Sequence, residues 1–68
     1  MKISARNRLK GKIAEIKKGA TTAHVKIKIG SATVTASITN EAVAELKLKK
    51  GQTAYAIVKA SDVMVGID

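Results

Sequence analysis

Alternation of apolar and polar residues is the main signal in this chain, and it predicts a run of β-strands. Residues 24–29 alternate without exception between polar and β-branched side chains, and residues 33–39 repeat the pattern after a Gly30-Ser31 turn. The side chains predicted to face inward are Val25, Ile27, Ile29, Val34, Ala36 and Ile38. Two such runs joined by a short glycine turn predict an antiparallel hairpin.

The stretch before this hairpin predicts a strand whose phase changes partway along. The apolar positions of residues 9–17 keep one phase up to Ile13, but Ile16 falls in the opposite phase. One extra residue near Ala14 or Glu15 accounts for the change. We therefore expect a bulged or strongly bent first strand, as found where small barrels turn corners.

A short helix and two further strands complete the pattern. Thr39-Asn40 before residues 41–46 predicts a capped helix, with Val43 and Leu46 on one face. Residues 53–59 predict a fourth strand that is apolar in both phases, as if covered on both sides, and residues 63–67 predict a fifth. Five strands with a helix between the third and fourth have the element order of an OB-like barrel. We expect a mostly β fold and a single domain over residues 1–68.

The small size of the chain predicts self-association. A domain of 68 residues exposes much surface for its volume and is marginal alone. Cysteine is absent and His24 is the single histidine, so neither a disulfide nor a thiolate or multi-histidine metal site can stabilise the fold. Oligomerisation is the remaining remedy.

Charge and hydropathy narrow the class of partner. The formal charge of +8 attracts anions of every kind without choosing among them. No apolar run approaches the ~20 residues of a membrane span, and residues 1–10 lack a secretory leader, so we expect a cytoplasmic protein. We find no carboxylate pair, Ser/His/Asp set or phosphate-cradling glycine loop, and therefore expect no enzyme.

Two clusters of hydrogen-bond donors carry the candidate chemistry. They are Ser4-Ala5-Arg6-Asn7 near the N-terminus and Lys59-Ala60-Ser61 near the C-terminus. An ionised oxyanion only accepts hydrogen bonds, so a pocket built from hydroxyl, guanidinium, ammonium and backbone N–H groups suits it. A small anion is the first ligand to consider.

Read end to end, the chain resembles the molbindins, the free-standing molybdate-binding proteins of the Mop or TOBE family. The resemblance lies in MKISARN, LKGKI, ITNEAVAEL and AYAIVKASDVMVGID, and it spans the whole sequence. It implies an OB-like barrel that binds molybdate or tungstate without an organic cofactor. It also implies a hexamer built as a trimer of dimers, in which neighbouring subunits share the donors.

The resemblance also implies which residues bind the anion. The candidates are Ser4, Ala5, Arg6, Asn7, Thr39, Lys59, Ala60 and Ser61. Thr39 fits this role on physical grounds too, because it precedes a helix whose first N–H groups lack intrahelical partners. Asn7 has two readings of equal weight, as a ligand contact or as a brace that bonds the backbone.

Other readings of the same residues stay open at this point. A basic OB-fold module could bind RNA or DNA through its lysines, but recognition of single strands relies on several aromatic faces and Tyr55 is the only one here. We expect Tyr55 in an interface or the core. A structural oligomerisation domain with vestigial sites is a third possibility. We assign His24 no role and expect Lys17, Lys18 and the lysines after the helix to be solvated.

Overall fold

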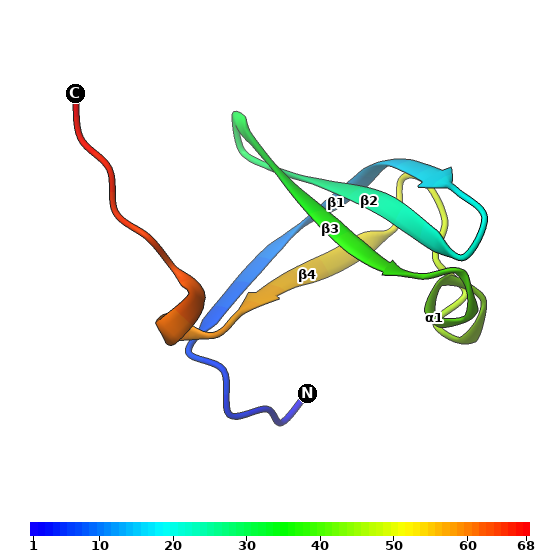
Figure 1. Cartoon of the computed structure of the whole chain (residues 1–68), viewed down its shortest axis with the longest axis horizontal. Helices are drawn as coiled ribbons and strands as arrows, with labels where there is room; N and C mark the ends of the chain where they lie inside the picture. Colours follow the sequence, from blue (N-terminus) through cyan, green and yellow to red (C-terminus); the bar gives the residue numbers. More distant parts are fainter.

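The computed structural model of residues 1–68 is one antiparallel four-stranded sheet with a short helix, as Figure 1 shows. The elements are β1 (Asn7–Lys18), β2 (Thr22–Ile29), β3 (Ala32–Thr39), α1 (Asn40–Glu45), β4 (Thr53–Val58) and a single 3-10 turn, η1 (Ala60–Asp62). The strand order is β3-β2-β1-β4. The expected mostly β fold with one short helix is confirmed.

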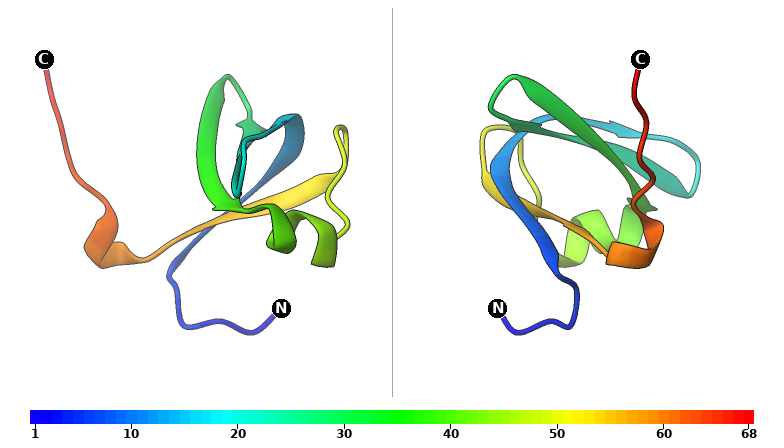
Figure 2. Two further views of the ribbon diagram at one scale, coloured as in Figure 1. Left: turned by 45° about the vertical axis from the view of Figure 1, so that its right-hand side comes forward. Right: turned by 90° about the vertical axis from the view of Figure 1, so that its left-hand side faces the viewer.

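The long first strand, β1, organises the sheet because it pairs with two different strands along its length. Its first half pairs with β4 from Asn7 to Lys12, and its second half pairs with β2 from Lys12 to Lys18. The register with β2 shifts between Ile13 and Glu15, which confirms the predicted irregularity. The shift lets the sheet curl (Figure 2), so that the apolar faces of β1, β2 and β4 turn toward one another.

The core inside this curl is small. Only 6 of the 68 residues are buried, all of them apolar. They are Ile13, Ala23, Val25, Ile27, Val43 and Ala56. So few buried side chains leave a large share of the aliphatic surface open to solvent, consistent with a subunit that needs a partner.

The helix begins as predicted and packs through one residue. Thr39 is its N-cap, and the Thr39 hydroxyl oxygen accepts a 3.0 Å hydrogen bond from the Ala42 N–H. Val43 is buried against the sheet, but Leu46 is 63% exposed. The predicted face is therefore buried at Val43 and open to solvent at Leu46.

The predicted fifth strand is absent, and with it the closed five-stranded barrel. After β4 the chain makes the η1 turn, held by a hydrogen bond from Asp62 N–H to Lys59 O of 2.9 Å. Residues 63–68 then run away from the sheet, as Figures 1 and 2 show. Alternating valines and isoleucine favour a strand, but a strand needs a neighbour with which to pair. Here the outer edges of β3 and β4 both stay unpaired.

The structure contains no helix that is long and apolar enough to cross a membrane.

Close packing at Gly11 leads to a stability prediction. A Cβ atom on Gly11 would meet the backbone oxygen of Lys28 and lie 2.8 Å from Ile29 Cγ1, whereas one on Gly66 would meet nothing within 4 Å. We expect Gly11→Ala to lower the free energy of unfolding by about 1–3 kcal/mol, the usual range for overpacking. Gly66→Ala, the matched control, should change it by less than about 0.5 kcal/mol. Urea unfolding followed by circular dichroism measures both; equal stability of the two variants would contradict the packing described for β1.

Candidate functional site

The β1–β4 ladder brings the two predicted donor clusters together. Asn7 pairs with Val58 at the end of this ladder, so Ser4–Arg6 precede the pair and Lys59–Ser61 follow it. The Asn7 amide nitrogen donates a 3.1 Å hydrogen bond to the Val58 carbonyl, across 51 residues of sequence. We call the region formed by residues 4–7 and 59–61 the seam. This hydrogen bond supports the interpretation that the Asn7 side chain stabilises the backbone and does not contact the ligand.

The seam presents cations without partner carboxylates. Arg6 and Lys59 are exposed, as are Ser4, Ala60 and Ser61, while Ala5 is half-buried. The one ion pair in the structure joins Lys26 to Glu15, at 3.4 Å, on the outer face of the sheet. Asp62 is close in sequence but pairs with neither Arg6 nor Lys59. Both charges are therefore free to meet an incoming anion.

Thr39 lies away from the seam. It ends β3 opposite Thr22 and begins α1, at the other end of the sheet from η1 in Figure 1. Unpaired N–H groups were expected at the start of α1. One of them has a partner already, because Ala42 N–H donates to the Thr39 hydroxyl oxygen. The hydroxyl hydrogen itself stays available as a donor. One chain thus brings seven of the eight predicted site residues together, and Thr39 stands apart.

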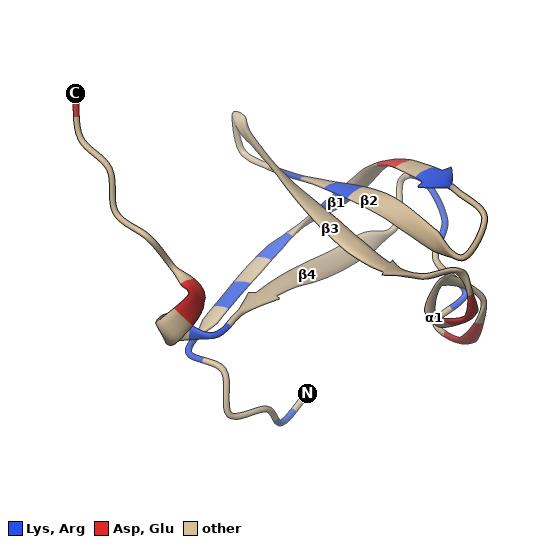
Figure 3. Cartoon of the chain, viewed as in Figure 1, with Lys and Arg blue, Asp and Glu red and all other residues tan.

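Basic residues predominate on the sheet. Figure 3 shows lysine and arginine along β1 and in β2 with one acidic residue in β1, and the other acidic residues on α1, in η1 and at the C-terminus. The register places Lys12 directly opposite Lys28 on the outer face. Like charges in such a pair repel each other. The sheet surface is therefore an electropositive region beyond the seam.

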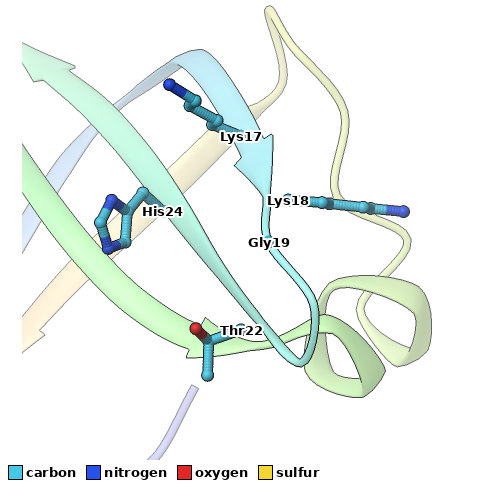
Figure 4. Close-up of a pocket in the computed structure, with 5 residues that line it drawn as sticks. All are labelled: Lys17, Lys18, Gly19, Thr22 and His24. Carbon is cyan, nitrogen blue, oxygen red and sulfur yellow. The ribbon is translucent and has the colours of Figure 1, made fainter.

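A second basic feature was not predicted from the sequence. A hollow of about 290 Å³ at the β1–β2 turn is lined by Lys17, Lys18, Gly19, Thr22 and His24, none of them hydrophobic. In Figure 4 Thr22 and His24 lie along β2, and the ammonium groups of Lys17 and Lys18 both point away from Thr22. The missing signal was the strand register, which sets Lys17 opposite His24.

A third feature is an apolar groove of about 390 Å³. Its lining comes from all four strands, from the residues after α1 and from the N-terminal Met1. The lining residues are Met1, Ile13, Ile27, Ala36, Ile38, Leu46, Leu48, Thr53, Ala54, Tyr55 and Ile57. Tyr55 is 45% exposed and lies in this groove, away from any second aromatic ring. The structure groups no three His, Asp or Glu side chains that could hold a metal ion.

Comparison with known proteins gives consistent matches over the whole chain. The family model of the TOBE domain matches residues 3–65. A probable molybdenum-pterin-binding protein of Haemophilus influenzae is 52% identical, with 100% of both chains aligned.

Solved structures agree in fold as well. A molybdate-binding protein from Sporomusa ovata superimposes with a TM-score of 0.93 at 37% identity, covering 98% of this chain and 100% of that one. The cytoplasmic molybdate-binding protein ModG, solved with molybdate bound, gives a TM-score of 0.92 at 42% identity, over 100% of this chain and 49% of ModG. With its donor seam, its curled sheet and this full-length similarity, the chain belongs to the TOBE-domain family, among the Mop-type molbindins.

Proposed function

We propose that this protein binds molybdate, with tungstate as a close analogue, and stores it in the cytoplasm. The observation that carries the proposal is the seam, where two donor clusters 51 residues apart meet through one ladder end. The relatives named for molybdate binding support the choice of ligand.

The chemistry of the seam suits an anion that accepts hydrogen bonds and donates none. Arg6 and Lys59 supply charge-assisted hydrogen bonds, and Ser4, Ser61 and the backbone N–H groups of this region supply neutral ones. Asn7 keeps the Val58 carbonyl occupied, which removes one acceptor from the anion's surroundings. Sulfate carries the same charge as molybdate, so the size of the pocket must separate the two. Such a site binds and releases its ligand without catalysis.

One subunit supplies only part of the pocket. The seam residues are mostly exposed, and Thr39 lies at the far end of the sheet. A tight anion site excludes water, and an exposed cluster does not do so alone. We propose that a neighbouring subunit covers the seam and brings its own Thr39 to it.

The apolar groove supports such an assembly. Four of the large exposed apolar side chains, Met1, Leu46, Tyr55 and Ile57, line the groove, and four more, Val63, Met64, Val65 and Ile67, lie in the unpaired C-terminal segment. At ~3.3 Å per residue, residues 63–67 extend over roughly 16 Å, comparable to β4. We propose that this segment of one subunit enters the groove of another and pairs with its open strand edges. A hexamer built from such dimers is the expected assembly.

A basic nucleic-acid-binding module is the other candidate function, and the outer face of the sheet favours it. The lysines there could contact phosphates, but Tyr55 belongs to the groove and provides no stacking surface beside them. Such binding would depend on counterion release alone and would be weak at physiological salt.

Substitutions at the seam test the molybdate site. We expect Arg6→Ala and Lys59→Ala each to weaken molybdate binding by about 1.5–3 kcal/mol, roughly ten- to a hundredfold, because each removes a charge-assisted hydrogen bond. Alanine at Lys26, Lys28, Lys49 or Lys50 should have a smaller effect, visible mainly at low salt, since exposed charges are screened. Calorimetric titration of each variant, after its mass in solution is checked, measures the difference. Equal losses at all six positions would show diffuse attraction in place of a defined site.

A second pair of substitutions tests the assembly. In an extended segment Val65 and Met64 point to opposite faces, and Val65 shares its face with Val63 and Ile67. We expect Val65→Lys to reduce the mass measured by light scattering to that of a monomer, because it places a charge in an apolar groove. Met64→Lys is the matched control and should retain the oligomer. A wild-type protein that is monomeric at micromolar concentration would overturn the proposed assembly.

A further inference from the structure

Asn40, the residue after Thr39, ties the start of α1 to the β1–β2 turn. Its backbone N–H donates to Thr21 O at 2.9 Å, and its amide nitrogen donates to Gly19 O at 3.1 Å and Ala20 O at 3.4 Å. We call these three hydrogen bonds the clamp. The two side-chain bonds span 21 and 20 residues of sequence, so the clamp is a tertiary contact and not part of the helix cap.

The clamp requires an asparagine side chain. Because two carbonyl oxygens face the same amide atom, that atom is the nitrogen, which has two N–H groups to donate. An ionised aspartate has the same size but only accepts hydrogen bonds, and alanine has no polar side-chain atom. Either substitution therefore removes the two side-chain bonds and leaves the backbone one.

The clamp also carries a cost in stability. The Asn40 side-chain oxygen is buried without a hydrogen-bond partner. An unpaired buried acceptor destabilises a fold, which offsets part of what the two donated bonds contribute. The clearest effect of the side chain is thus to fix where the start of α1 lies.

Thr39 is held on both sides by these contacts. The β2–β3 ladder pairs it with Thr22, and the clamp holds the residue that follows it. Its hydroxyl oxygen accepts the Ala42 N–H at 3.0 Å, which orients the hydroxyl and leaves its hydrogen free to donate. The Thr39 donor is therefore fixed in place, although the residue itself is exposed.

A fixed donor matters because molybdate and sulfate carry the same charge. A pocket that separates the two by size works only if its walls do not close in on the smaller anion. A donor on a mobile loop can follow sulfate inward, whereas a donor held by packing and hydrogen bonds cannot.

We propose that Asn40 is a positioning residue that sets the selectivity of the anion site. The clamp keeps Thr39 at the place that suits molybdate and prevents it from following sulfate. This inference rests on the proposed function, in which Thr39 of one subunit enters the seam of its neighbour. Asn40 does not touch the anion and acts through Thr39.

The ratio of the sulfate and molybdate dissociation constants of the assembled protein measures this role. Calorimetric titration with molybdate, alone and in competition with sulfate, gives both constants once the mass of each variant in solution is checked. We expect Asn40→Ala to weaken molybdate binding roughly tenfold and sulfate binding by less than about threefold, so that the ratio falls. Asn40→Asp keeps the side-chain size, and its added charge acts alike on two dianions, so its ratio should fall as well.

Two controls separate positioning from a loss of stability. Val25→Ala removes buried atoms from the core and none from the clamp, so it should lower the unfolding temperature and keep the ratio within about twofold of the wild type. Thr39→Val removes the hydroxyl through which Asn40 acts. Adding Asn40→Ala to Thr39→Val should therefore weaken molybdate binding by less than about a further twofold.

Three results would overturn the proposal. They are an unchanged ratio in both Asn40 variants, an equal fall of the ratio in Val25→Ala, and full additivity of Thr39→Val with Asn40→Ala. If Thr39→Val bound molybdate as tightly as the wild type, the proposed pocket itself would be wrong, and this inference with it. A loss in Thr39→Val with an unchanged ratio in the Asn40 variants would leave the pocket standing and remove the role of Asn40 alone.

Discussion

The pairing of β1 with β4 is the constraint on which the rest of the structure depends. It joins the start of the chain to its end through a ladder that closes at Asn7 and Val58. Without it, Arg6 and Lys59 would belong to two separate chain ends, and bringing them to one anion would cost the conformational entropy of ordering the backbone. Beyond this ladder β1 continues into the bulged part that pairs with β2, so the same strand builds the small core and positions the donors.

Two asparagines share one chemical task at opposite ends of the sheet. Asn7 occupies the Val58 carbonyl beside Lys59, and Asn40 occupies three carbonyl groups of the β1–β2 turn. In each place an amide that could itself bind a ligand instead removes backbone acceptors from the neighbourhood of lysines. An oxyanion is repelled by carbonyl oxygens, and a carbonyl that already accepts a hydrogen bond repels it less.

The local features of the fold could be predicted from the sequence because they depend on near neighbours. Strict alternation over residues 24–29 and 33–39 located β2 and β3, the phase change near Ala14 located the bulge, and Thr39 located the helix cap. The pairing of the two donor clusters agreed with the family resemblance.

The expectations that failed depend on contacts with distant parts of the molecule. The 63–67 segment has the pattern of a strand, but no alternation tells whether its neighbour lies in the same chain, and Leu46 is exposed for the same reason. The hollow beside His24 was missed because only the register across a hairpin sets Lys17 next to it.

Backbone amide NMR of the wild-type assembly during a molybdate titration tests the central claim most directly. If the seam is the molybdate site, the largest saturable shifts fall on residues 4–7 and 59–61, with Thr39 responding at the same anion concentrations. Shifts spread evenly over the lysines of β2 and of the loop after α1, with no saturation at the seam, would contradict the account.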